Sequence, residues 1–260
     1  MRGTDFLVSG EKTKTWYTRN KIQDDKGKRR EKKDKREREK ESSMTDRKVA
    51  VRIACYGDSL IQGFPFTKEN SWVATAERTG AGTWENHGIC GECCDDITDR
   101  VLRRRNWNDA RLLLYEGGMN DIIQGVPLPF SLGQMERARR CAAEAGLPTL
   151  FVLPWYCAAA ELNPFIRRLR DGMRQQFPQG KRVPGTGAAK EADGTETTGT
   201  DGPGVWFLDF EPVFPQGEGD ELAAKRRPYF IWDGVHPTAE TYELLGNYAA
   251  KTFMGFDAVK

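Results

Sequence analysis

The sequence is short of several residue types and patterns, and each shortage excludes a class of protein. Its 260 residues contain only six cysteines, too few for a disulfide scaffold in a chain of this length and in keeping with a reducing compartment. No stretch has the length of a membrane span, and the first residues include no apolar signal segment. These absences predict a soluble, cytoplasmic protein without a transmembrane segment.

Charge is unevenly distributed along the chain. Residues 1–50 hold 17 Lys and Arg against 10 Asp and Glu, a net charge of +7, whereas the whole chain carries only +2. The segment 21–41 has a single aliphatic residue, so it cannot bury enough apolar surface to offset the entropy of ordering. We expect a disordered or charged-helix basic tail over 1–48 and a globular domain over 49–260.

The basic tail has more than one possible role. It can tether the protein to nucleic acid or to an anionic surface, or it can be a solubilising segment. Its interleaved acidic residues weaken the net field, which favours the solubilising role. Met44 lies just before the globular pattern begins, so an internal translation start is a third alternative.

From Val51 onward, apolar runs alternate with helical patterns. The predicted strands are 51–57, 83–88, 110–118, 147–155 and 205–210, and the predicted helices are 68–79, 92–104, 132–146, 159–177 (interrupted near Pro164) and 238–253. This order predicts an α/β fold with a five-stranded parallel sheet and right-handed crossovers. Residues 179–204 are rich in Gly, Thr and charge, and we expect a disordered insertion there.

Functional residues in such sheets gather at the carboxyl ends of the strands. Ser59, in the stretch CYGDSLIQG, alone among the six serines lies where a predicted strand ends and a helix begins. A serine hydroxyl becomes a useful nucleophile only when a base takes its proton. The alternative is that Asp58 and Ser59 merely cap the helix, and the tripeptide alone favours the cap.

The scarcity of histidine narrows the choice of base, because the chain has only His87 and His236. His87 has no acid placed immediately beside it in sequence. Asp233 precedes His236 by three residues, so its carboxylate can hold Nδ1–H and leave Nε2 to face Ser59. The Asp–His spacing alone fits a simple turn equally well, but together with Ser59 it favours a catalytic triad.

A nucleophilic serine also needs donors for the oxyanion that forms on the substrate carbonyl. The candidates are the backbone N–H groups of Ser59 and Gly91 and the side-chain amide of Asn120. A glycine at position 91 would let the backbone approach a substrate closely. Turn geometry alone would also account for the glycines at these strand ends.

Four short blocks now stand in order along the chain: GDSL at 57–60, Gly91 within NHGICGE, GMND at 118–121 and DGVH at 233–236. In this order they resemble the SGNH (GDSL) hydrolase family over about residues 51–255. The resemblance implies a flavodoxin-like three-layer α/β/α sandwich that uses no metal and no organic cofactor.

The same resemblance assigns roles to the site residues. It implies Ser59 as nucleophile, His236 as base and Asp233 as the group that orients it. It implies an oxyanion hole built from Ser59, Gly91 and Asn120, and hydrolysis of small or lipid-like acyl esters, as in small esterases and lysophospholipase- or thioesterase-like members. The alternatives are a carbohydrate O-acetylesterase and a non-catalytic binding protein with the same fold.

Two further features lie near the predicted site. Where the family usually has Gly-Asp-Thr, this sequence has Gly91-Glu92-Cys93-Cys94, a departure that could alter the acyl pocket. Cys90, Cys93 and Cys94 lack the second ligand pair of a structural zinc site, so we interpret them as small structural residues, although a thiol at a helix N-terminus can be oxidation-sensitive. Trp155 and Trp232 are candidate walls of the substrate pocket.

Overall fold

The computed structural model describes residues 51–80, 82–107, 109–183, 203–217 and 219–254. The chain divides into two units, Met1–Ala50 and Val51–Lys260, and all the described residues belong to the second. The predicted basic tail at 1–48 therefore lies outside the described residues, as do positions 184–202 of the predicted insertion.

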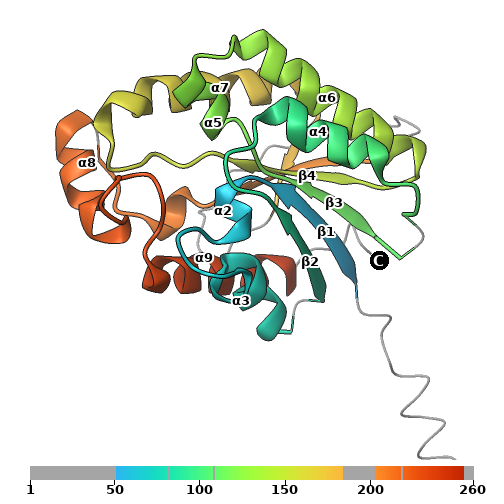
Figure 1. The fold of residues 1–260 in the computed structure, drawn as a ribbon, viewed down its shortest axis with the longest axis horizontal. Coiled ribbons are helices and arrows are strands. Elements are labelled where there is room, and N and C mark those ends of the chain that lie inside the picture. Colours follow the sequence, from blue (N-terminus) through green and yellow to red (C-terminus); the bar gives the residue numbers. More distant parts are fainter. Residues whose placement is uncertain (1–50, 81, 108, 184–202, 218, 255–260) are drawn as a thin grey trace, which may run out of the picture. The chain divides into compact units, whose positions relative to one another are not determined.

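A parallel sheet, six-stranded among the described residues, forms the middle of the domain (Figure 1). Its strands, in the order β2-β1-β3-β4-β6-β5, are β2 (Thr83–Gly88), β1 (Arg52–Gly57), β3 (Leu112–Tyr115), β4 (Thr149–Leu153), β6 (Val205–Asp209) and β5 (Lys181–Arg182). Every pairing is parallel. This is the flavodoxin-like strand order with one edge strand added, so the predicted fold is confirmed, with six strands where five were expected.

The additional strand, β5, begins inside the segment predicted as a disordered insertion. It pairs with β6 at the edge of the sheet, and both of its side chains are exposed. Val183 follows it, is buried, and donates its N–H to the carbonyl of Phe207 at 3.1 Å. Because the strand is held by main-chain pairing and has no apolar run, its sequence does not predict it.

Helices cover both faces of the sheet. In Figure 1, α3 (Trp72–Arg78) and α9 (Ala239–Met254) lie on one face, and α4 (Cys94–Arg103), α6 (Leu128–Glu144) and α7 (Asn163–Gln176) lie on the other. Three further α-helices of the described residues are α2 (Ser59–Gln62), α5 (Met119–Gln124) and α8 (Gly219–Arg226). Pro164 lies in the first turn of α7 and starts the helix instead of interrupting it. The sequence patterns missed α5 and α8.

The two faces of the sheet bury separate hydrophobic clusters, because successive side chains of a strand point to opposite faces. In β1, Ile53 and Cys55 belong to the cluster under α3 and α9, together with Trp72 and residues of α9. Ala54 and Tyr56 belong to the cluster under α4, α6 and α7. The alternation explains why β1 is apolar from Ile53 to Tyr56, since the side chains on both of its sides are buried.

Helices α3 and α9 pack closely at Gly246, a residue of α9. A Cβ atom at Gly246 would lie 2.4 Å from Cβ of Thr75 and 2.6 Å from the carbonyl oxygen of Trp72. The two helix backbones can approach this closely only because position 246 has no side chain.

The Gly246→Ala substitution should therefore lower the free energy of unfolding by about 1–3 kcal/mol, as overpacking typically does. Alanine by itself favours helix over glycine by about 1 kcal/mol, so the measured loss reports the packing. Gly133→Ala is the matched control, since position 133 of α6 is exposed and a Cβ there meets nothing within 4 Å. That control should be neutral or stabilising in urea unfolding followed by far-UV circular dichroism. Equal effects of the two substitutions would contradict the close contact of α3 with α9.

Candidate active site

Ser59 is the first residue of α2 and follows β1 after a single intervening residue. Asp58 caps this helix, because its Oδ1 accepts the N–H of Leu60 at 2.8 Å. A Cβ at Gly57 would lie 2.3 Å from Cγ1 of Ile61, so the turn into the helix requires glycine there. Since Asp58 alone makes the cap, the hydroxyl of Ser59 is left for another partner.

That partner is His236. The Oγ of Ser59 lies 2.8 Å from Nε2 of His236, and Nδ1 of His236 lies 2.6 Å from Oδ2 of Asp233. The other carboxylate oxygen, Oδ1, accepts the main-chain N–H of His236 at 3.0 Å and that of Val235 at 2.9 Å. The structure thus brings together all three residues that the sequence predicted as a triad.

The loop that carries His236 is held at both of its ends. Phe230 and Pro237 form an isolated antiparallel bridge, and the N–H of Ile231 donates to the carbonyl of His236 at 2.8 Å. Gly234 has a φ of +74° and accepts the N–H of Ala158, in the loop after β4, at 2.8 Å. The imidazole is therefore placed by main-chain contacts on two sides.

The charge state of Asp233 follows from its surroundings. Partial burial acts to raise the pKa of this carboxyl, but the main-chain N–H groups of His236 and Val235 and the imidazole outweigh it, so the pKa lies below its ordinary value. Asp233 is therefore ionised at neutral pH, which suits it to hold Nδ1–H and to stabilise a protonated imidazole.

The predicted oxyanion donors lie on segments that are hydrogen-bonded to one another. The N–H of Cys90, next to Gly91, donates to Oε1 of Gln62 in α2 at 2.9 Å. The Asn120 amide, at the start of α5, donates to the carbonyl of Glu92 at 2.9 Å and to Oδ2 of Asp58 at 3.3 Å. Gly91 has a φ of +81°, and a Cβ there would meet nothing within 4 Å, so open space borders this backbone.

Two carboxyl groups are buried under the nucleophile turn. Asp58 is 0% exposed and Glu116, after β3, is 2% exposed, and the N–H of Asp58 lies 3.4 Å from Oε2 of Glu116. Burial raises the pKa of Asp58 to about 6. Burial, and the nearby Asp58, raise the pKa of Glu116 well above its ordinary value. The only signal of Glu116 in the sequence is a glutamate that directly follows the apolar strand β3.

The two tryptophans predicted as pocket walls differ sharply. Trp155 is 3% exposed and packs in the core against Phe210 and Phe214, with ring centroids 5.7 and 6.2 Å apart. A side chain enclosed in this way cannot wall an open pocket, so we leave it out of the site. Trp232 is 82% exposed and directly precedes Asp233, a position compatible with the edge of the site.

The side chains of the second histidine and of the cysteines take no part in the contacts among Ser59, His236 and Asp233. Nε2 of His87 lies 3.2 Å from Oε2 of Glu85, and its ring stacks on Tyr56. Cys93 and Cys94 are buried, whereas Cys90 is exposed. Within the described ranges, no group of three His, Cys, Asp or Glu side chains is arranged to hold a metal ion, and no helix is long and apolar enough to cross a membrane.

Known structures share this fold. A member of the lipolytic protein G-D-S-L family from Veillonella parvula is 16% identical with a TM-score of 0.58, over 80% of this chain and all of that one. The psychrotrophic esterase EstA from a Pseudoalteromonas species is 13% identical (TM-score 0.57, 78% of this chain, 96% of that one). A carbohydrate esterase family 3 structure from Talaromyces cellulolyticus is 12% identical (TM-score 0.53, the same coverage).

At these sequence identities, the similarity to the solved structures establishes the fold alone. No curated protein matches the sequence. The family model of the GDSL-like lipases and acylhydrolases matches residues 55–244, a range that begins in β1 and ends in α9 and so includes every residue of the site described above. The chain belongs to the GDSL-like lipase/acylhydrolase family, whose members hydrolyse ester bonds.

Proposed function

We propose that this hydrolase is a serine esterase that cleaves carboxylic esters through an acyl-enzyme on Ser59. The observation that carries the proposal is the unbroken set of contacts from Asp233 to His236 (2.6 Å) and from His236 to Ser59 (2.8 Å). Both distances are those of hydrogen bonds, short enough for a proton to pass from Ser59 to His236.

In this mechanism the Oγ of Ser59 attacks the ester carbonyl carbon while Nε2 of His236 takes the hydroxyl proton. The resulting tetrahedral oxyanion collapses, the bond to the alcohol oxygen breaks, and the alcohol leaves with the proton that His236 returns. Water then attacks the carbonyl carbon of the acyl-serine and gives a proton to His236. The bond from this carbon to Oγ breaks, His236 returns the proton to Oγ, and the carboxylic acid departs. Asp233 keeps its negative charge throughout and stabilises the imidazolium.

The oxyanion would be stabilised by three donors from three segments: the N–H of Ser59, the N–H of Gly91 and the amide of Asn120, which would exchange its longer hydrogen bond, to Oδ2 of Asp58 at 3.3 Å, for one to the oxyanion. The contacts that join these segments hold them before substrate arrives, and preorganised donors of this kind contribute a large share of rate enhancement in acyl transfer. Support for Gly91 comes from the open space beside its backbone.

Exposed apolar side chains favour an apolar acyl group. Each of the four segments that carry a site residue also carries at least one such side chain. They are Phe64 after α2, Ile89 before Gly91, Ile123 in α5 and Trp232 before Asp233. The Phe64 ring lies 4.7 Å from the His236 imidazole, which places it beside the base. An apolar ring beside the base, with further exposed apolar side chains on the segments that carry the site, favours esters of medium or longer acyl chains over small polar esters.

A carbohydrate O-acetylesterase is the second candidate. A carbohydrate esterase shares the fold, and an acetyl group requires no acyl pocket. A non-catalytic binding protein is disfavoured, since all three residues of the proposed triad are in place.

The Ser59→Ala substitution should lower kcat by at least about 10³-fold on an aryl ester, because it removes the atom that forms the acyl-enzyme. A fluorophosphonate probe should label the wild-type protein at Ser59 and leave the variant unlabelled, as read by intact-protein mass spectrometry. Ser131→Ala, a change at the buried serine of α6, is the control. Retention of full activity by the Ser59 variant would sink the proposal.

The Asp233→Asn substitution should lower kcat by about 10³–10⁴-fold, since an amide favours the wrong imidazole tautomer. Its effect on stability should depend on pH. Because the pKa of Asp233 is depressed in the folded protein, its carboxylate adds stability that is present above the ordinary pKa of about 4 and lost as pH falls through the folded value. The stability gap between variant and wild type should therefore narrow below about pH 4 in acid unfolding curves; a gap independent of pH would contradict the assignment.

A chain-length series of aryl esters should separate the two candidate functions. We expect kcat/KM to rise from acetyl toward medium chains by about 10-fold or more, given roughly 0.8 kcal/mol for each methylene that becomes buried. The Trp232→Ala variant should flatten this rise, and Leu244→Ala, which removes another exposed apolar side chain, in α9, should not. Activity confined to acetylated sugars would favour the O-acetylesterase instead.

A further inference from the structure

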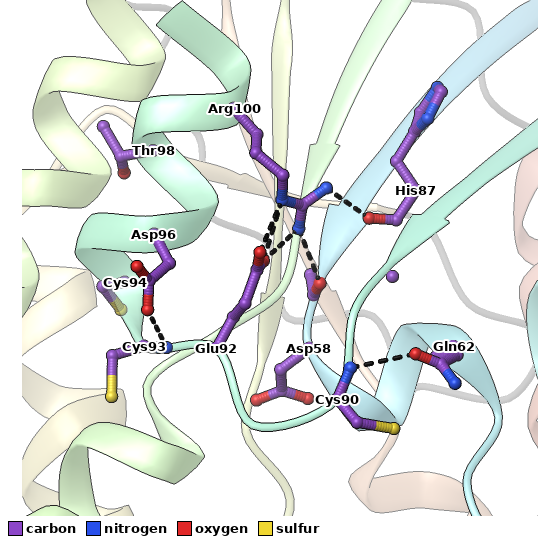
Figure 2. Close-up of polar contacts among 12 residues, drawn as sticks. Asp58, Gln62, His87, Cys90, Glu92, Cys93, Cys94, Asp96, Thr98 and Arg100 are labelled. Carbon is purple, nitrogen blue, oxygen red and sulfur yellow. Dashed lines mark hydrogen bonds and ion pairs between the residues drawn. The ribbon is translucent and has the colours of Figure 1, made fainter.

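Arg100 of α4 contacts three separate segments of the chain with one guanidinium group. Its Nε donates to Oε1 and Oε2 of Glu92 at 2.9 and 2.8 Å, and its Nη2 also contacts Oε2. Nη1 donates to the carbonyl of His87 at 2.6 Å, and Nη2 donates to the carbonyl of Gly57 at 3.1 Å. Figure 2 shows the guanidinium between Glu92 and the end of β2 at His87.

These contacts reach the segments that carry two of the three proposed oxyanion donors, Ser59 and Gly91. Gly57 ends β1, two residues before Ser59, and pairs in register with Gly88 at the end of β2. Glu92 directly follows Gly91. A single cation therefore holds the strand end that presents the nucleophile and the loop that presents Gly91.

Glu92 passes this restraint on to Asn120. Its carboxylate is bound by Arg100, while its main-chain carbonyl accepts the Asn120 amide at 2.9 Å. On the other side of Gly91, the N–H of Cys90 is held by Gln62 at 2.9 Å (Figure 2). Gly91 is thus restrained on both sides although its own φ of +81° is one that glycine adopts readily and needs neighbours to fix.

We propose that Arg100 and Glu92 form a positioning pair that sets the Gly91 N–H and the Asn120 amide relative to Ser59 for binding of the oxyanion. This inference rests on the proposed function of Ser59. Neither side chain touches the triad, so the pair acts through the main chain at Gly57, His87 and Glu92. Glu92, the acidic member of the pair, lies in the segment Gly91-Glu92-Cys93-Cys94, where the sequence departs from the usual family pattern.

The chemistry of the pair suits this role. The guanidinium is a planar fork that binds a carboxylate with two donors and keeps others for carbonyls, which the ammonium of lysine cannot reproduce in the same geometry. The side chains of Arg100 and Glu92 are only 19% and 16% exposed, so little water is available to replace either partner. A displacement of about 1 Å in such a site can cost about 10²-fold in rate.

A second arginine provides a matched control. Arg170 of α7 donates Nη1 to the carbonyl of Pro154 after β4 at 2.7 Å and Nη2 to Oδ2 of Asp209 at the end of β6 at 2.9 Å. It is likewise largely buried and likewise joins a carboxylate to a strand-end carbonyl, but on strands that present none of the proposed site residues. Its loss should cost stability without moving the oxyanion donors.

The test compares Arg100→Lys with Arg170→Lys on one aryl ester. Arg100→Lys should lower kcat by about 10–100-fold while KM stays within about 3-fold. A displaced oxyanion donor weakens binding of the transition state but leaves binding of the ground-state ester intact. Arg170→Lys should keep kcat within about 2-fold despite a lower melting temperature. Equal kcat losses in the two variants, or a normal kcat in Arg100→Lys, would overturn the proposal.

A second variant, Glu92→Gln, tests the proposed positioning pair if Arg100→Lys does not fold. Glu92→Gln keeps the volume of the side chain and one acceptor oxygen, and it should lower kcat by about 3–10-fold with KM unchanged. It should also weaken binding of a trifluoromethyl ketone, which forms a tetrahedral adduct with serine, by the same factor as kcat/KM. A Glu92→Gln protein with wild-type kcat and wild-type affinity for the ketone would refute the pair. Ser59→Ala in the same assay separates the two proposals, since full activity there defeats the function itself and leaves the Arg100 result as a purely structural effect.

Discussion

The parallel register of β1 with both of its neighbours is the constraint on which the rest of the site depends. Gly57 is level with Gly88 of β2, and Tyr56 is level with Tyr115 of β3. The three neighbouring strands therefore end at nearly the same level of the sheet. A Cβ at Gly88 would lie 2.2 Å from the N atom of Gln62, which means that α2 rests directly on the end of β2. The segments that follow these strands lie close together because the carboxyl ends of parallel strands are at the same edge of the sheet.

The elements that could be predicted are those whose signal is local. The range 83–88 was predicted for the second strand and is the observed one, since alternating residues end there in a glycine. Short segments held by distant partners are not predicted. β5 forms through its pairing with β6, and the glycines before α5 mask its helical pattern. Trp155 was misplaced because position near a strand end does not reveal on which side of the sheet a ring is buried.

The same distinction applies to the site. Ser59, Asp233 and His236 could be predicted as a triad because the small number of histidines and the three-residue spacing of Asp233 and His236 can be read from the sequence alone. Arg100 was not, because along the chain it is one of several arginines on a charged helix. Its proposed role depends, besides Glu92, on carbonyls 13 and 43 residues away, and main-chain acceptors have no residue-type signature. Glu116 is similar, since its burial against Asp58 depends on the pairing of β1 with β3.

The Ser59–His236 contact joins residues that are 177 positions apart, one after the first strand of the sheet and one before its last helix. During synthesis the proposed nucleophile is made early and has no base until almost the entire domain has been translated. Domains of this kind fold as units, so under the proposed mechanism the hydroxyl gains reactivity only when the strands between the two residues have assembled. The order of the chain would thus withhold hydrolytic activity from every incomplete product, and an unfinished enzyme would not attack the esters around it.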